Sequence, residues 1–241
     1  MHNRAVPVTA EGETMDSSNE SNDGNSQNQE GGGRKKRAKP AYQREPEELR
    51  DEIWAAGQIT PLQLFRIVAW KSAKGLAPVS LNSEEDIKRW TSNALEATSR
   101  WRATNVLTDT IDWDEWEYAA GTAIGASKQA VGDANKSGLL ALDGVGYPVA
   151  SAILGLLLPK AFPVIDKWTI LGVYGPKAKN WQRKVVYRNF TERLVEVAHH
   201  FPNCSSIHEV DKAVMNTVID CPNEDERWTC LPFDRITQPS A

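Results

Sequence analysis

Two apolar runs separated by a glycine-rich turn constrain the fold more than any other feature of the sequence. They lie in LLALDGVGYPVASAILGLLLPKAFPVID, which begins at Leu139 and ends at Asp166. Pro148 suits a helix start, because the N–H that proline lacks would have no intrahelical partner there. The stretch therefore predicts a short helix ending at residues 142–143, a turn through 144–146 and a second helix that restarts near 147–148.

The turn residues Gly144, Val145 and Gly146 suit contact with another backbone. Glycine adopts backbone angles that side chains forbid and lets a second chain approach closely. Exposed N–H groups where the next helix begins, at Tyr147, can bind a phosphate oxygen. Such a turn suits binding to the DNA backbone without recognition of the base sequence. Many helix pairs also turn on glycine without this role, so the turn alone favours a structural interpretation.

The rest of the chain after Pro46 has mostly helical apolar spacing. In TPLQLFRIVAW, Thr60 is the expected N-cap, and one face carries Leu64, Phe65, Val68 and Ala69. The segment LNSEEDIKRWTSNALEATSRW offers Asn82 or Ser83 as its cap. Further helical patterns lie in DWDEWEYAAGTAIG, ERLVEVAHHF and SSIHEVDKAVMNTV. Few alternating runs compete with them, so we expect an all-α fold without internal repeats.

The N-terminal residues differ in composition from the rest. Residues 1–33 are rich in Ser, Asn, Gly and Glu, and such a composition buries too little apolar surface to offset chain entropy. We expect a disordered polar and basic tail over 1–44 and one folded domain over 45–241. Five of the six residues 34–39 are basic. They form either a solvated arm or a tether for polyanions.

Charge and cysteine content exclude several classes of protein. The formal net charge of −4 argues against a uniformly basic nucleic-acid coat, although residues 159–193 carry eight Lys or Arg against two acids. Cys204, Cys221 and Cys230 lack paired CxxC spacing and are expected to be free thiols. No run of 18 apolar residues suggests a membrane span. We expect a soluble, cytoplasmic, monomeric protein.

The segment LDGVGYPVASAILGLLLPKAFPVIDKWT closely resembles the helix-hairpin-helix DNA glycosylase superfamily, especially its adenine glycosylase and endonuclease III branch. There an LPGVG turn, an alanine-rich helix and an FPxxD segment follow one another at the same spacing. The resemblance covers about thirty residues. It implies a two-lobed helical fold and a hairpin, Gly144 to Gly146, that binds DNA phosphate, often with a monovalent cation. It also implies that Asp166 is catalytic.

Two departures from the family narrow the chemistry. Bifunctional members carry a Schiff-base lysine two residues after the last hairpin glycine, where this chain has Pro148. We therefore expect a monofunctional enzyme that uses water. The adenine branch has a four-cysteine cluster near its C-terminus, which the three cysteines here do not match. No iron-sulfur cluster is expected, and no metal either, because His199, His200 and His208 look like surface or ordinary packing residues.

The chemistry of base excision fits a single carboxylate. Breaking the bond between base and deoxyribose builds oxocarbenium-like positive charge on the sugar. A partly desolvated Asp166 would stabilise that charge and orient or deprotonate the attacking water. An aspartate before a helical run is also a common N-cap, so Asp166 is expected to cap the helix of Lys167 and Trp168 as well.

Excision also requires that the base leave the duplex and enter a pocket. The segment AWKSAKG lies at the distance before the hairpin at which the adenine branch has its glutamine-containing wedge motif. Trp70, Lys71 and Ser72 are therefore candidates for base stacking, phosphate contact or wedging, although Trp70 could equally be core. Tyr147, Lys167 and Lys71 are the expected DNA-binding side chains. Trp113 and Trp116 either line the pocket or pack a helix.

The sequence thus predicts a monofunctional N-glycosylase acting on double-stranded DNA. Its lean pattern looks like small bacterial glycosylase-like proteins, among which are antiphage enzymes that excise hypermodified cytosines such as glucosylated hydroxymethylcytosine. Oxidised or alkylated bases are the alternative substrates. Two other interpretations remain open: a non-catalytic helix-hairpin-helix DNA-binding module, and a structural helical protein in which GVG is only a turn.

Overall fold

Helix α7 (Tyr147–Leu157) packs against helices on several sides and is apolar all round. Every residue from Val149 to Leu157 is buried, which extends the single buried face predicted from the sequence. The structure, a computed structural model, describes residues 45–72, 75–125, 137–178, 186–222 and 229–233. Gly146 is the N-cap of α7 and Pro148 lies in its first turn. The predicted start of a second helix after the glycine turn is confirmed.

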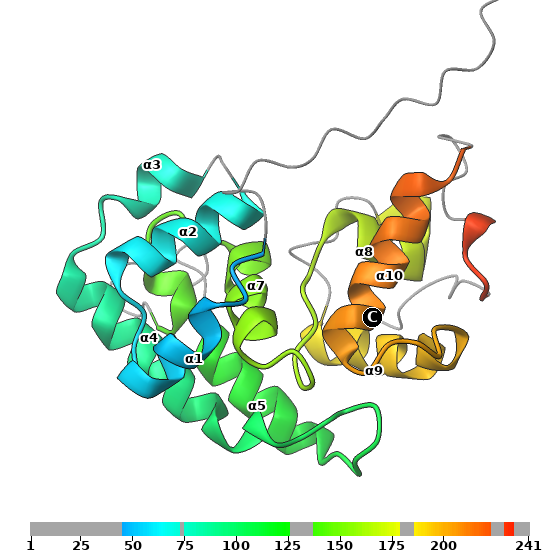
Figure 1. The fold of residues 1–241 in the computed structure, drawn as a ribbon, viewed down its shortest axis with the longest axis horizontal. Coiled ribbons are helices and arrows are strands. Elements are labelled where there is room, and N and C mark those ends of the chain that lie inside the picture. Colours follow the sequence, from blue (N-terminus) through cyan, green and yellow to red (C-terminus); the bar gives the residue numbers. More distant parts are fainter. Residues whose placement is uncertain (1–44, 73–74, 126–136, 179–185, 223–228, 234–241) are drawn as a thin grey trace, which may run out of the picture. The chain divides into compact units, whose positions relative to one another are not determined.

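The helices that precede α7 form one packed group. They are α1 (Leu49–Ala56), α2 (Pro61–Lys71), α3 (Leu76–Val79), α4 (Glu84–Thr98), the 3-10 turn η3 (Ser99–Arg102) and α5 (Trp113–Ile124). Helix α2 packs on α7 and on α3, and α4 packs along α5. Figure 1 shows α1 and α2 on the same side of α7, and both helices contact it.

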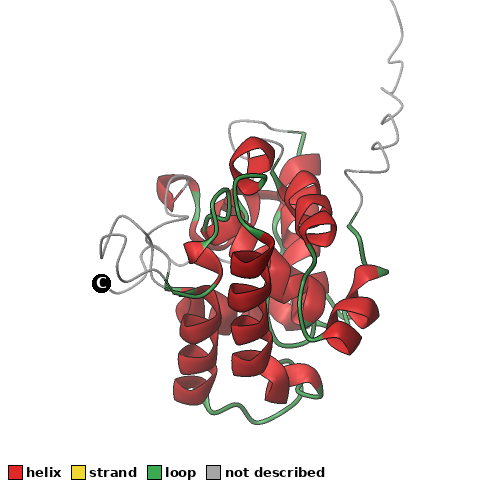
Figure 2. Ribbon diagram, turned by 90° about the vertical axis from the view of Figure 1, so that its left-hand side faces the viewer, coloured by secondary structure: helices red, strands yellow, loops and turns green. Residues whose placement is uncertain are grey.

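The helices that follow α7 pack mainly on one another. They are α8 (Lys167–Tyr174), η6 (Pro176–Ala178), α9 (Tyr187–Val197), η8 (Ala198–His200) and α10 (Ile207–Asp220). Helix α8 lies along α10, as Figure 1 shows, and α9 contacts both α10 and α5. In the residues that are described, every regular element is helical (Figure 2). The all-α fold class is confirmed.

Side-chain caps begin the helices largely where the sequence indicates. Thr60 and Gln63 form a reciprocal capping box at α2, with Pro61 at the first position. Ser83, rather than Asn82, caps α4. The predicted apolar face of α2 is wrong at one position: Phe65 is 41% exposed, and Ile67 is buried in its place. Leu64, Val68 and Ile67 share one helix face at spacings of three and four, and Phe65 lies beside that face.

Trp116 belongs to the core. Its indole stacks on Phe162 at 5.0 Å between ring centroids and lies 5.1 Å from Tyr187. Its Nε1 donates to the Ala161 carbonyl at 3.0 Å. Trp113 packs edge-on against Trp116. Of the two roles expected for these tryptophans, the one found is helix packing.

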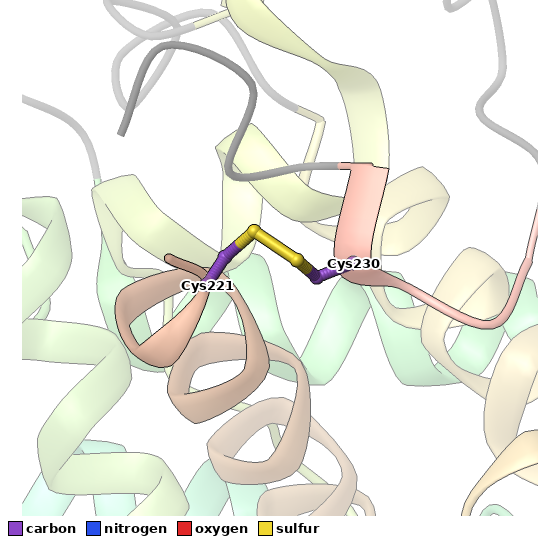
Figure 3. The surroundings of a disulfide bond; sticks show 2 residues. All are labelled: Cys221 and Cys230. Carbon is purple, nitrogen blue, oxygen red and sulfur yellow. A yellow bond between two sulfur atoms is a disulfide. The ribbon is translucent and has the colours of Figure 1, made fainter. Parts of the chain in front are cut away.

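A disulfide corrects the prediction that all three cysteines are free. Cys221, which follows the last residue of α10, bonds to Cys230 with 5.9 Å between Cα atoms (Figure 3). The prediction was wrong because a separation of nine residues without a CxxC pattern still allows the chain to return. Cys204 is free and partly buried, as expected.

Some predictions concern parts of the chain that are not described. The expected tail, 1–44, and its basic run, 34–39, lie outside the described residues, as do Lys179, Arg183 and Lys184 of the C-terminal basic run. Among the helices that are described, none is long and apolar enough to cross a membrane.

Candidate active site

The first hairpin glycine is fixed by packing against α3. The element before it, η5 (Leu139–Ala141), is one 3-10 turn instead of the predicted short helix. Gly144 has a φ of +78°, and a Cβ added there would lie 2.5 Å from the Gly75 carbonyl oxygen and 2.7 Å from the Val79 nitrogen. Gly144 therefore serves a close contact within the protein, and no other residue type fits this backbone and this space.

Asn82 forms hydrogen bonds with both backbone groups of Asp143, the residue before Gly144. Its Oδ1 accepts from the Asp143 N–H at 2.7 Å, and its Nδ2 donates to the Asp143 carbonyl at 2.9 Å. The same Nδ2 also donates to the Val79 carbonyl at 2.8 Å. Asn82, which the sequence offered as a possible helix cap, instead holds the hairpin on the chain that follows α3.

Gly146 is the hairpin residue that remains open to a partner. It is exposed, and an added Cβ would meet only Pro148 Cδ, at 3.9 Å. Its carbonyl accepts the first helical bonds of α7, from Val149 and Ala150 at 2.9 Å each. Val145 is buried, with its side chain in the core. A phosphate approaching this turn would meet the backbone at Gly146 and the N-terminal end of α7.

The extended segment that leads to Asp166 is held by side chains from four helices. In a helix or a sheet, hydrogen bonds to other backbone groups would satisfy the N–H and C=O groups of this segment. Here side chains bond to them instead. The bonds are Trp116 Nε1 to Ala161 O at 3.0 Å, Tyr187 Oη to Pro163 O at 2.5 Å, Val164 N to Asp211 Oδ2 at 2.7 Å and Ile165 N to Ser151 Oγ at 2.9 Å. Because α5, α9, α10 and α7 each contribute one contact, the position of Asp166 is determined by the packing of all four.

Asp166 uses its two carboxylate oxygens differently. Oδ1 accepts from the Trp168 N–H at 2.8 Å, so the predicted N-cap of α8 is confirmed. Oδ2 accepts from Lys71 Nζ at 3.0 Å. Lys71 is the last residue of α2, and its side chain is 12% exposed against 24% for Asp166. The sequence assigned Lys71 to a DNA phosphate, whereas in the structure it forms an ion pair with the candidate catalytic carboxylate.

Both residues line an open pocket of about 440 Å³. Besides Lys71 and Asp166, the lining consists of Glu45, Trp70, Val164, His208, Asp211, Lys212, Met215 and Asn216. Trp70 is half-buried, lines this pocket and also packs against the core. The pocket therefore brings together three sequence-predicted residues, Trp70, Lys71 and Asp166.

Other predicted site residues lie outside this lining. Ser72 is the C-cap of α2. Lys167 is exposed, with its ammonium 4.4 Å from the Trp168 ring centroid. Tyr147 is half-buried and meets Tyr187 edge-on at 6.5 Å. Gly144, Val145 and Gly146 are likewise not among the lining residues.

Sequence reasoning missed a chain of charged side chains in the lining of the pocket. His208 Nδ1 lies 3.0 Å from Asp211 Oδ2, and His208 Nε2 lies 2.7 Å from Glu45 Oε1. Lys212 forms an ion pair with Glu45. The expectation of an ordinary surface or packing histidine at 208 is thus wrong, since this side chain is buried between two carboxylates. The spacing of His208 and Asp211, one helical turn apart, was the available indication.

These contacts shift the ionisation of the cluster. Burial opposes the charged imidazolium, but Asp211 and Glu45 outweigh that effect and raise the pKa of His208 to about 9. Burial also opposes ionisation of Glu45, but His208 and Lys212 outweigh it and lower the pKa of Glu45 to about 2. At neutral pH the Glu45 carboxylate therefore faces a charged His208.

The arrangement places a carboxylate, an amine and an aromatic side chain in the lining of one pocket. Within the described ranges, no group of three His, Cys, Asp or Glu side chains could hold a metal ion. Comparisons with family models, with curated proteins and with solved structures found no match.

Proposed function

We propose that this protein is a DNA N-glycosylase that releases a modified base with water and leaves an abasic site. The observation that carries the proposal is the placement of Asp166. Four helices hold the segment before it, the N-terminus of α8 holds its Oδ1, its Oδ2 accepts from Lys71, and the residue lines an open pocket of about 440 Å³. A carboxylate held in this way stabilises developing positive charge on a sugar without having to reorganise.

The hairpin supports DNA as the substrate. Gly144 and Asn82 fix the turn, and the exposed Gly146 leaves the start of α7 accessible to a phosphate. In this proposal the hairpin binds the backbone beside the flipped nucleotide, in a two-lobed arrangement with Asp166 between the lobes. Pro148 leaves no amine on the first turn of α7, so base release is of the monofunctional type.

The pocket suits a flipped base with a polar substituent. Its volume falls within the range of small-molecule sites, about 300–1,000 Å³. Trp70 offers a face for stacking, while Lys212 and Asn216 from α10 offer hydrogen bonds at a distance from the sugar. We propose hypermodified cytosines of phage DNA, in an antiviral role, as the first substrates to test. Oxidised and alkylated bases are the second class.

The decisive test replaces Asp166 with asparagine. Asparagine also caps helices well, so the α8 start is retained while the charge is lost. Purified protein is incubated with genomic DNA from phages that carry different base modifications, and with oxidised and alkylated DNA. Released bases are measured by mass spectrometry and abasic sites by alkali cleavage. We expect release by the wild type and a loss of about a hundred- to a thousand-fold in Asp166→Asn, with DNA binding retained.

One observation favours a second candidate, a DNA-binding module without catalysis. Both oxygens of Asp166 already have partners, Lys71 and the Trp168 N–H, as a purely structural cap would. If wild type and Asp166→Asn bind DNA equally and neither releases a base from any of these DNAs, the binding module replaces the glycosylase.

A further inference from the structure

A second pocket, of about 220 Å³, lies at the C-terminal end of α7. It shares no lining residue with the pocket of Asp166. The hairpin lies at the other end of α7, which has eleven residues and is therefore about 16 Å long. Helix α1 packs on α7 (Figure 1) and contributes to the lining. The polar and aromatic side chains around this second pocket are Arg50, Asp51, Trp54, Trp101, Arg102 and Lys160.

The lining of the second pocket carries more positive than negative charge. Arg50, Arg102 and Lys160 contribute three cations and Asp51 one carboxylate, which leaves a net charge of +2. Within the described ranges, none of these three cations forms an ion pair. The chain as a whole has a net charge of −4, so its acids outnumber its bases elsewhere. Cations that gather in one pocket without carboxylate partners attract an anion to it.

Part of this arrangement serves the fold. Arg50 Nε donates to the Leu156 carbonyl at 2.7 Å, and Trp54 Nε1 donates to the Leu157 carbonyl at 3.1 Å. Both carbonyls belong to the last turn of α7, where no intrahelical N–H remains to bond them. This capping accounts for Arg50 Nε and for Trp54. It does not account for Arg102 or Lys160, whose side chains are exposed.

Trp101 gives an independent indication that the second pocket takes a ligand. The residue is 5% exposed, and in the part of the chain that the structure describes its Nε1 is a buried donor without a hydrogen-bond partner. An indole nitrogen donates and does not accept, so only an acceptor can satisfy it. Leaving such a donor unpaired is unfavourable. An anion whose oxygens only accept would satisfy this donor and the three cations together.

We propose that the second pocket binds a phosphate monoester, the terminal phosphate either of a free nucleotide or of a 5′-phosphorylated DNA end. A monoester carries close to two negative charges at neutral pH, which match the net charge of +2, and three strong acceptor oxygens. Arg102 Cζ lies 4.5 Å from the Trp54 ring centroid, a stacking that orients its guanidinium for paired N–H bonds to phosphate. A backbone phosphodiester carries one negative charge and a sugar on each side, and so fits this pocket less well.

This site goes beyond base release and does not rest on the proposed function. The residues that the two activities use are different, since the second pocket lies at the opposite end of α7 from the hairpin and lacks Asp166. Base release measured with Asp166→Asn therefore tests the glycosylase, and phosphate binding tests the second pocket. Failure of either result leaves the other standing.

Calorimetric titration of the full-length protein tests the charge requirement. We expect dAMP and inorganic phosphate to bind, and deoxyadenosine, which lacks the phosphate, not to bind. Arg102→Gln and Lys160→Gln each remove one charge from an exposed side chain, and each should weaken dAMP binding about tenfold or more. Arg89→Gln is the matched control, because Arg89 is exposed and its Cζ lies 4.6 Å from the Trp90 ring centroid, outside the pocket. It should bind dAMP as the wild type does.

Two oligonucleotides of one sequence, with and without a 5′ phosphate, identify the source of the monoester. If the phosphorylated one binds more tightly and Arg102→Gln removes the difference, the ligand is a DNA end. If both bind alike while dAMP still binds, the ligand is a free phosphate compound. The indole Nε1–H signal of Trp101, assigned in an NMR spectrum by its loss in Trp101→Phe, should move when dAMP is added.

Several results would overturn the proposal. They are the absence of dAMP and phosphate binding, equal dAMP binding by wild type, Arg102→Gln and Lys160→Gln, and a Trp101 signal that dAMP does not move. DNA binding that both variants weaken equally with and without the 5′ phosphate, while dAMP does not compete, would instead make the second pocket a contact for the DNA backbone. Wild-type titration and the Trp101 signal do not depend on any variant folding for their outcome with dAMP.

Discussion

The two hairpin glycines have different physical reasons to be glycine. Gly144 has a φ of +78° and touches the backbone of Gly75 and Val79. Gly146 has a φ of −93° and open space around its Cα. The first is therefore required by the fold, whereas the second is required, under the proposed function, by the DNA backbone that approaches it.

Substitutions at these two positions should separate stability from DNA binding. Gly144→Ala combines a left-handed backbone with a clash against main-chain atoms, so we expect a loss of about 2 kcal/mol or more, and a Tm lower by several degrees. Gly146→Asp places a preferred N-cap residue at α7 and a negative charge on the phosphate path. We expect an unchanged or higher Tm together with a large loss of DNA affinity. Thermal unfolding and DNA-binding titrations measure the two effects, and normal affinity in Gly146→Asp would count against the hairpin as the DNA contact.

At this scale, local relations were predictable and distant ones were not. The N-cap role of Asp166 and the start of α7 depend on neighbours within four residues, which the sequence displays. The ion pair between Lys71 and Asp166 joins residues 95 positions apart, and the Glu45–His208 contact joins residues 163 apart. No periodicity carries such information, because these contacts result from how the helices pack.

At the scale of elements, residues 162–166 form no helix or strand although they lie among helices. Side chains satisfy four backbone groups of residues 161–165, and Ser151 on α7 supplies the acceptor for the Ile165 N–H. Both groups are buried. The Ser151 hydroxyl also donates to the Pro148 carbonyl at 3.1 Å. One small polar residue in an otherwise apolar helix therefore fixes the residue before Asp166.

We expect Ser151→Ala to destabilise the protein although alanine is the better helix former. The Ile165 N–H would remain buried without its acceptor, which costs about 1–3 kcal/mol, against a gain of less than about 1 kcal/mol in helix propensity. Ser92→Ala on α4 is the control, because that hydroxyl bonds the Gly57 carbonyl where water can replace it. Urea unfolding of both variants gives the comparison. Equal stability of the two variants would show that the Ser151 contact does not hold the segment.

Helix boundaries were predictable where capping chemistry was present, and less so elsewhere. Thr60 and Ser83 accept from the first turns of their helices as the sequence indicates, and Ser206 does the same at α10. The helix expected before the hairpin is only the 3-10 turn Leu139–Ala141, whose three residues are buried. The prediction was wrong at Phe65 because Leu64 and Phe65 are adjacent apolar residues, and only Leu64 points to the buried face of α2.

At the scale of the whole molecule, the Cys221–Cys230 bond ties the chain after α10 back to its helix. Leu231, next to Cys230, packs so closely on Gly172 of α8 that its Cδ1 lies 3.1 Å from the position a Cβ would take there. We expect one free thiol per denatured, unreduced chain, from Cys204, and three after reduction. Closing a loop of this size contributes at most about 2–3 kcal/mol, so Cys221→Ser should lower the Tm by several degrees. Three free thiols without reductant would contradict the bond.

The buried His208 links α10 to the first described residue, since it contacts Glu45 as well as Asp211 on its own helix. Its pKa is raised to about 9, from an ordinary value near 6.5. A pKa raised by folding contributes stability that is fully present below the unfolded value and is lost as the pH rises through the folded value. The contribution is on the order of 3 kcal/mol, and the loss should fall between about pH 6.5 and 9.

Urea unfolding of wild type and His208→Gln at a series of pH values checks this linkage. Glutamine cannot take the proton, so the variant should be less stable at pH 6 and should lack most of the decline toward pH 9.5. Low pH acts on Glu45, the other member of this contact. The pKa of Glu45 is lowered to about 2, so its contribution is present above about 4.5 and is lost as the pH falls toward 2. Parallel curves for wild type and variant from pH 6 to 9.5 would mean that His208 is not charged between its two carboxylates, and that this part of the pocket lining is held by packing alone.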